Sequence, residues 1–136
     1  MKLNQIKNAL ELTNEGIYTA KIIGVTKADP ISGTQSNIIN VTLEELNNAP
    51  KKIFVSTKRE TPQDFSIWDR TVLDIFRQLN MLDADIDTDD IESVNAYVKG
   101  KSVVAYCVHN QSADGKTYAN FYFSKNNKVQ AMLAFQ

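Results

Sequence analysis

The sequence contains little of the chemistry on which most enzymes and secreted proteins depend. Among its 136 residues there is one cysteine, Cys107, and one histidine, His109. A single cysteine excludes an intramolecular disulfide, and we expect Cys107 to be a buried, unreactive thiol in a strand. There is no G-x-S-x-G, C-x-x-C or Walker motif. We therefore expect no catalytic residues, no cofactor and no enzymatic activity; an enzyme would need a polar pocket around His109, which the sequence does not indicate.

Long apolar runs are also missing. No stretch approaches the roughly 20 apolar residues that a membrane-spanning helix requires. The N-terminal sequence MKLNQIKNALELTNEG has polar residues every few positions, which is not the pattern of a secretory signal. We expect a cytoplasmic protein that does not enter a membrane. Hydrophobic residues make up 43% of the chain, which is enough for the core of one domain.

The negative charge is concentrated in one segment. Residues 83–92, DADIDTDDIE, contain six acidic residues and no basic one, whereas the rest of the chain has 15 basic and 10 acidic residues. A basic surface elsewhere is therefore compatible with the net charge of −1. The alternating aspartates resemble a calcium loop, but the required glycine is absent and Ala96 stands where the loop needs glutamate. We expect no metal site, and an acidic segment that complements a helix N-terminus.

Period-two alternation predicts three strands in the first half of the chain, over 17–27, 37–45 and 51–57. Gly24 lies inside the first strand and predicts a bulge or bend. The segment 29–36, DPISGTQS, predicts a loop.

The period then changes to about 3.6 residues. Thr61 as a cap and Pro62 at the first helical position predict a helix over 62–80, and a second helix is expected over 89–98, capped by Thr88. Two further strands follow at 102–108 and 118–123, joined by a turn at Asp114-Gly115. The apolar stripe of the first helix comprises Phe65, Trp68, Val72, Ile75, Phe76 and Leu79.

This order of elements predicts a mostly β fold with helices. We expect an OB-fold, a five-stranded Greek-key barrel with a helix between strands three and four. The OB-fold domain covers 15–124, after an N-terminal extension over 1–14 in which Leu3, Ile6 and Leu10 have helical spacing. An apolar tail covers 125–136, and its side chains are expected to pack on the barrel or across a dimer interface.

Aromatic and basic residues on the strands suggest a binding surface. Proteins that bind single-stranded nucleic acid stack bases on side-chain rings and attract the backbone with cations. Phe54 alternates with Lys52 and Ser56, so we expect its ring to face away from the core. The predicted nucleic-acid-binding residues are Lys27, Lys51, Lys52, Phe54, Lys58, Arg59, Lys116, Tyr118 and Tyr122.

The chain resembles the small single-stranded-DNA-binding proteins of bacteriophages of Gram-positive hosts. The resemblance covers roughly residues 15–124 and rests on EGIYTAKIIGV, NIINVTLEEL, KKIFVST, the intervening helix and KGKSVVAYCV…DGKTYANFYFS. It implies an OB-fold that coats single-stranded DNA in phage replication or recombination. It also implies that the protein forms homo-oligomers such as dimers and interacts with replication or recombination proteins. The chain departs from many bacterial single-strand binders in ending in apolar AMLAFQ and not in an acidic tail.

A second function remains open. The same fold could serve as a protein-interaction or assembly module without nucleic-acid binding, and fold alone does not decide between the two. The apolar tail and the low net charge favour this alternative, whereas the strand aromatics and lysines favour binding of single-stranded DNA.

Overall fold

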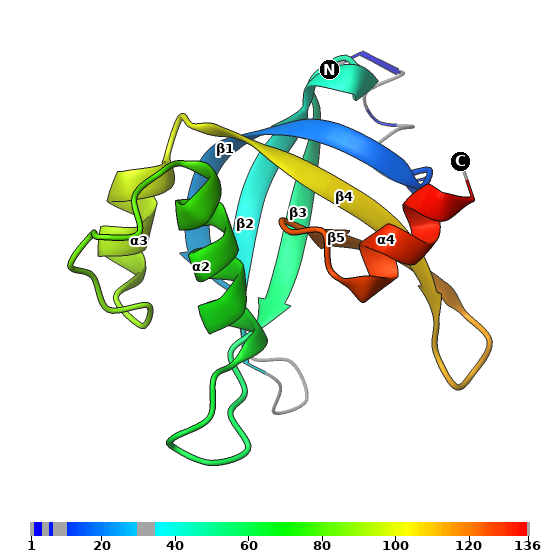
Figure 1. Ribbon diagram of the computed structural model, residues 1–136. Coiled ribbons are helices and arrows are strands. Elements are labelled where there is room, and N and C mark those ends of the chain that lie inside the picture. Colours follow the sequence, from blue (N-terminus) through cyan, green and yellow to red (C-terminus); the bar gives the residue numbers. More distant parts are fainter. Residues whose placement is uncertain (1, 4–5, 7–10, 30–34, 136) are drawn as a thin grey trace.

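The computed structural model describes residues 2–3, 6, 11–29 and 35–135, and these form one curled antiparallel sheet with helices packed against it (Figure 1). The prediction of a mostly β fold with helices is confirmed. The sheet has the order β3-β2-β1-β4-β5, so β3 and β5 are its edges, and within the described residues no ladder joins them. The strands are β1 (Gly16–Lys27), β2 (Ser36–Leu43), β3 (Ala49–Ser56), β4 (Ser102–Gln111) and β5 (Thr117–Tyr122).

The bulge predicted at Gly24 is present in β1. The register between β1 and β2 shifts between Ile22 and Gly24, and the first half of β1 also pairs with β4. The backbone N–H of Val25 donates to the Asn95 side chain at 2.8 Å. The bulge thus bends β1 so that one strand serves both halves of the sheet, and a side chain from a helix satisfies a backbone group beside it.

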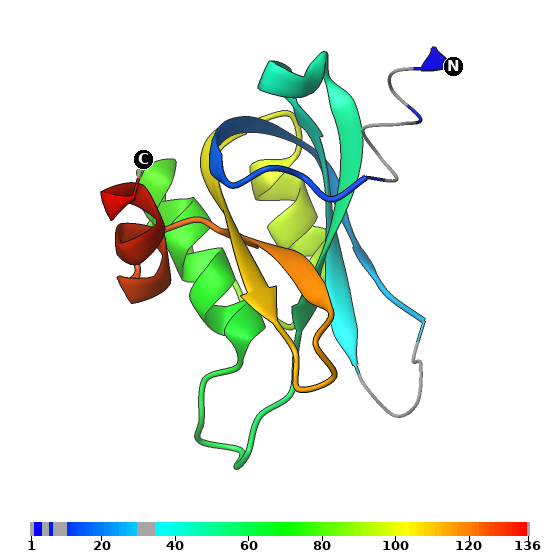
Figure 2. The same ribbon diagram turned by 90° about the vertical axis from the view of Figure 1, so that its right-hand side faces the viewer.

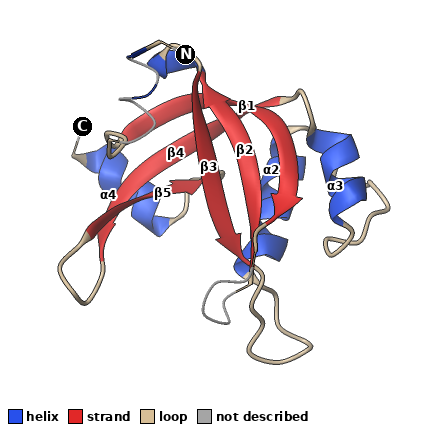
Figure 3. Cartoon of the chain, turned by 180° about the vertical axis from the view of Figure 1, so that it is seen from behind, coloured by secondary structure: helices blue, strands red, loops and turns tan. Residues whose placement is uncertain are grey.

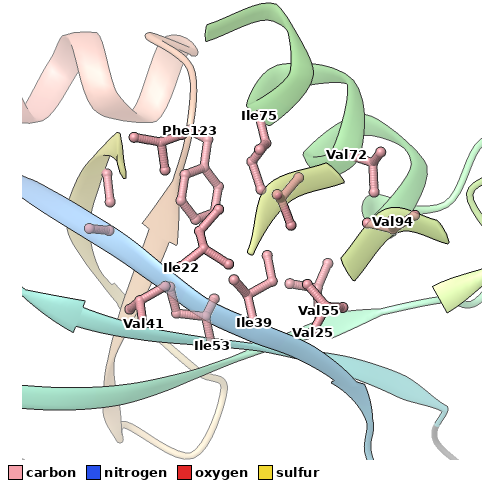
Figure 4. Packing of buried hydrophobic residues seen from close by; sticks show 14 of the residues in the cluster. Ile22, Val25, Ile39, Val41, Ile53, Val55, Val72, Ile75, Val94 and Phe123 are labelled. Atoms are coloured by element: carbon pink, nitrogen blue, oxygen red, sulfur yellow. The ribbon is translucent and has the colours of Figure 1, made fainter. Parts of the chain in front are cut away.

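The alternation of side chains gives the sheet an inner and an outer face. The inner face carries Ile22, Ile39, Val41, Ile53 and Val55, which meet helical side chains in one core (Figure 4). The helices that contribute are α2 (Ile67–Gln78) and α3 (Ile91–Val98), which lie between β3 and β4 in the chain. Trp68 of α2 is 1% exposed, as expected for the largest side chain of the helix stripe.

Helix α2 begins five residues later than the sequence predicted. Ser66 caps it, and Ser66 and Asp69 form a complete capping box. Thr61 and Asp64 use the same chemistry in an isolated turn, in which the Thr61 N–H donates to the Asp64 carboxylate at 2.9 Å. Phe65 consequently precedes the helix and is exposed, so its assignment to the buried stripe was wrong.

Helix α3 begins at Ile91 and is capped by Asp90, not by Thr88. Thr88 instead accepts a hydrogen bond from the Trp68 indole through its carbonyl, at 2.8 Å. Its hydroxyl donates to Asp69 at 2.7 Å. The segment before α3 is therefore attached to the N-terminal end of α2.

The apolar tail forms helix α4 (Asn127–Ala134), which lies on the outer face of β4 and β5 (Figure 2). Val129 and Met132 are buried there against Tyr106 and Val108. The prediction that the tail packs on the sheet is confirmed for Val129, Met132 and Leu133, but it was wrong for Phe135, which is 92% exposed because it follows the last turn of α4. Helix α4 also explains why four consecutive residues of β4, 105–108, are buried, since the core covers one face of the strand and α4 the other. The short 3₁₀ helix η1 (Glu44–Leu46) connects β2 to β3.

Candidate nucleic-acid interface

In the part of the chain that the structure describes, no helix covers the outer face of β2 and β3. Seen from behind, β2 and β3 lie in front of the helices (Figure 3). On this face Ile38 of β2 pairs with Phe54 of β3, and Asn40 pairs with Lys52. We call these four residues the β2–β3 surface. It carries an aromatic ring, an aliphatic side chain, a cation and an amide within two neighbouring cross-strand pairs.

Phe54 has the orientation that the sequence predicted. Its neighbours along β3, Ile53 and Val55, are 6% and 5% exposed, whereas Phe54 is 61% exposed. Successive side chains of a strand point to opposite faces, so the burial of the two neighbours forces the Phe54 ring outward. A phenylalanine side chain this exposed gains little from the fold, and binding is one function that accounts for it.

Asn40 is held in place by the bulge of β1. Its Nδ2 donates to the Gly24 carbonyl and to the Thr26 hydroxyl, both at 3.4 Å. The amide therefore links β2 to the bent part of β1 next to Lys52. Lys52 itself is exposed, and Lys21 of β1 lies on the same outer face, opposite Thr42.

Lys51 lies on the other side of the sheet from Lys52. It pairs with the buried Val41, and it is half-buried on the inner face. Burial lowers the pKa of the Lys51 ammonium group. The sequence analysis placed Lys51 and Lys52 together, but the structure puts only Lys52 on the surface that carries Phe54.

Three further predicted cations lie at a strand end or in a loop. Lys27 ends β1 and lines a small hollow of about 370 Å³ with Gln35 and Thr57. Lys58 follows β3 and is 4.0 Å from Glu60, an exposed pair that contributes little stability. Lys116 is exposed in the β4–β5 turn. These loop cations flank the sheet without lying on the β2–β3 surface.

Arg59 is engaged in a structural ion pair. Its guanidinium is 2.8 Å from Asp69, and it also reaches Asp89 at 3.4 Å. Burial by itself would raise the pKa of the Asp69 carboxyl, but hydrogen bonds from Thr88, the Ser66 backbone and Arg59 lower it. Two carboxylates already compensate Arg59, which makes it a weaker candidate for phosphate binding than Lys52. The role assigned to Arg59 from the sequence stays a prediction.

The two candidate tyrosines lie on β5, the opposite edge of the sheet from Phe54. Tyr118 pairs with Asn110 on the outer face and is exposed. Tyr122 packs against the cluster beneath α4, and its hydroxyl accepts a hydrogen bond from Asn110 Nδ2 at 3.4 Å. Tyr118 is therefore free to stack with a base, whereas much of the Tyr122 ring is used by α4.

Ile38 and Asn40 were not among the residues chosen from the sequence. The alternation of β2 indicates that they point outward, but it does not say what they face. Their position beside Phe54 and Lys52 depends on the register of β2 with β3. That register comes from the η1 connection and from left-handed backbone at Asn47 and Asn48, with φ of 57° and 58°.

The residues that could have indicated catalysis have structural contacts. His109 Nε2 lies 2.7 Å from the Thr13 carbonyl, and the His109 N–H donates to Glu15 at 2.9 Å. Burial raises the pKa of the Cys107 thiol to about 11, so the thiolate is scarce at neutral pH. Within the described ranges no group of three or more His, Cys, Asp or Glu side chains is arranged to hold a metal ion.

Among the helices in the described part of the chain, none has the length and apolar character to cross a membrane. Comparison of the sequence with protein-family models, and with curated proteins, gave no match.

Proposed function

We propose that the chain binds single-stranded DNA, without strong sequence preference, on the β2–β3 surface. The observation that carries the proposal is the exposed Phe54 ring on a face that no helix of the described residues covers, with Lys52 two residues away on the same strand. Every base presents a flat face for stacking, so an aromatic platform is tolerant of sequence. The Lys52 ammonium group attracts the phosphates of the DNA backbone. The loop cations Lys27, Lys58 and Lys116 extend this attraction beyond the sheet.

We infer that the sheet is an OB-type barrel that stops short of closure. The pairings of β1 with β2 and β4, and of β2 with β3, support this inference, as does the bulge that lets β1 serve both halves. The two helices between β3 and β4 also occupy the place in the chain where OB-folds carry a helix. In OB-folds the face of strands two and three is the usual surface for oligonucleotides, and here that face contains Phe54.

The roles of the remaining predicted residues follow from their positions. Tyr118 supplies a second stacking ring from β5, and Tyr122 supports it from beneath α4. Lys51 and Arg59 act on the fold more than on the ligand, because one lies on the inner face and the other is paired with carboxylates. From the sequence resemblance we infer the biological setting. The protein would be a cytoplasmic homo-oligomer that coats single strands in phage replication or recombination.

A fluorescence-anisotropy titration tests the proposal. The probes are labelled oligo(dT), the same length of double-stranded DNA, and RNA, each at two salt concentrations. We expect oligo(dT) to bind more tightly than the duplex, with an affinity that falls as salt rises because phosphate contacts release counterions. Equal affinity for duplex and single strand, or no binding at low salt, would contradict the proposal.

A protein-interaction module is the second candidate function. It is favoured by an apolar groove between α2 and the loop of residues 81–89, whose lining includes no residue of the β2–β3 surface. A chain that fails to bind every nucleic acid in the titration but forms a complex through this groove would be such a module.

A further inference from the structure

An open groove of about 600 Å³ lies between the loop that precedes α2, α2 itself and the loop of residues 81–89. Its lining is largely apolar and includes Phe65, Leu73, Phe76, Met81, Leu82 and Ile86. Three of these side chains, Phe65, Leu73 and Leu82, are exposed to solvent. Large apolar side chains gathered in one exposed groove indicate a surface that binds another polypeptide.

The charge around the groove specifies what kind of polypeptide fits. Asp64 and Asp89 line it, and Asp83, Asp85 and Asp87 are exposed on the loop that forms one wall. Two cations, Arg59 and Arg70, also line the groove. Arg59 is already paired with carboxylates, and the five exposed aspartates outnumber Arg70. The groove therefore suits an apolar segment that carries lysine or arginine.

The chain itself contains such a segment. Residues 1–12, MKLNQIKNALEL, have Leu3, Ile6 and Leu10 at the spacing i, i+3 and i+7, and the segment carries two lysines, Lys2 and Lys7, against one acidic residue, Glu11. This spacing is the one by which amphipathic helices anchor in apolar grooves. Leu3 is 82% exposed, so its own molecule leaves it uncovered.

The described residues of the segment lie far from the groove of the same molecule. The Thr13 carbonyl, just after the segment, is 2.7 Å from His109 of β4. In Figures 1 and 2 residues 2–3, in dark blue, lie well away from α2 and from the loop before it. We propose that residues 1–12 of one copy of this chain bind in the groove of a second copy. This contact joins two different surfaces, so it builds head-to-tail assemblies and not only symmetric dimers.

Sedimentation of the full-length protein over a wide range of concentrations tests the proposal without DNA, so its outcome is independent of the proposed function. We expect the wild-type mass to rise with concentration above the 15.3 kDa of one chain. Leu3→Asp disables the segment and Leu82→Asp the groove, and each variant should sediment as a single chain. Phe135→Asp, an exposed apolar residue at the end of α4, is the matched control and should assemble like the wild type.

Mixing the two variants gives the sharpest result. Leu3→Asp keeps an intact groove and Leu82→Asp an intact segment, so an equimolar mixture should form a one-to-one dimer that grows no further. Leu82 lies outside the core cluster, so its substitution should not unfold the protein; Phe65→Asp is a second groove variant with the same expectation.

Several results would overturn the proposal. They are a wild type that stays a single chain at every concentration, variants that assemble normally, or a mixture that remains monomeric. Loss of assembly in Phe135→Asp alone would place the interface at α4 and not at the groove.

Discussion

The two halves of the outer sheet face differ in what covers them. On β4 and β5 the outward side chains Tyr106, Val108 and Tyr122 lie beneath α4. On β2 and β3, which carry the outward pair Phe54 and Ile38, no helix of the described residues covers the outer face; seen from behind, these strands lie in front of the helices (Figure 3). Both halves carry aromatic side chains, so alternation alone does not separate core from surface. The tail of the chain makes the difference, because it supplies a partner for one half only.

The comparison teaches which aromatics hold the fold and which are available to a ligand. A ring beneath α4 contributes to stability through buried area. A ring on the β2–β3 surface contributes little to stability and is free to stack with a base. Substitutions in the half beneath α4 should therefore change mainly stability, and substitutions on the β2–β3 surface should change mainly the affinity for DNA.

The largest effect is expected on stability in the covered half. Tyr106→Ala removes a ring that is 9% exposed, and we expect it to lower the free energy of unfolding by about 3 kcal/mol. Phe54→Ala, the matched aromatic in the bare half, should change it by less than about 0.5 kcal/mol. Urea denaturation of both variants measures the difference. Equal losses would show that Phe54 is part of the core and that the two halves are alike.

The Asp69 network should affect stability but not binding. Asp69→Asn removes charged hydrogen bonds at a side chain that is 10% exposed, and such bonds contribute about 1.5–3 kcal/mol. The folded state lowers the pKa of Asp69, so its stabilisation is complete above the unfolded pKa of about 3.9. It is lost as the pH falls through the lower folded-state pKa, and Asp69→Asn should reduce this acid sensitivity.

Thermal melting of the wild type and Asp69→Asn between neutral and acidic pH checks this prediction, with oligo(dT) binding at neutral pH as the control. If Asp69→Asn melts like the wild type but binds oligo(dT) more weakly, Arg59 and Asp69 contribute to DNA binding and not to the stability of the fold.

Removing the exposed ring should weaken binding without unfolding the protein. A stacked base contributes about 1–3 kcal/mol, so Phe54→Ala should weaken oligo(dT) binding by about five- to a hundredfold. Phe135→Ala removes a still more exposed ring from the end of α4 and serves as the matched control, with unchanged affinity. If the two variants bind alike, stacking on Phe54 is not part of the mechanism.

The smallest effect distinguishes two adjacent lysines. Lys52→Ala removes a cation from the β2–β3 surface and should reduce the slope of log affinity against log salt by about 0.7, the value for one single-strand phosphate. Lys51→Ala removes a cation from the inner face and should leave the slope unchanged. The same anisotropy titrations at several salt concentrations measure both, and equal changes would mean that the side of the sheet does not matter.

Local patterns predicted the strands and their faces. The alternation around Phe54 and the glycine within β1 are short-range signals, and both the outward ring and the bulge are present in the structure. The start of α2 was wrong because Thr61 and Ser66 each begin a capping pattern. Only the one at Ser66 is followed directly by the buried stripe from Trp68 to Phe76.

Long-range packing set the limit of the sequence analysis. Nothing within β4 indicates that both of its faces are buried, because α4 comes from the tail of the chain, beyond β5. The pairing of Ile38 with Phe54, and of Asn40 with Lys52, likewise depends on the register between β2 and β3. The sequence of either strand alone does not determine that register. The sequence therefore predicted the outward orientation of Phe54 but not the residues around it.

Photo-crosslinking tests the central claim most directly, because it locates bound DNA on the protein. Oligo(dT) is crosslinked to the wild-type chain with ultraviolet light, and the attached tryptic peptides are identified by mass spectrometry. We predict crosslinks on the peptide of residues 53–58, IFVSTK, which contains Phe54. Crosslinks confined to α2, α4 or the loop of residues 81–89, with none on residues 53–58, would contradict the assignment of the β2–β3 surface as the binding site.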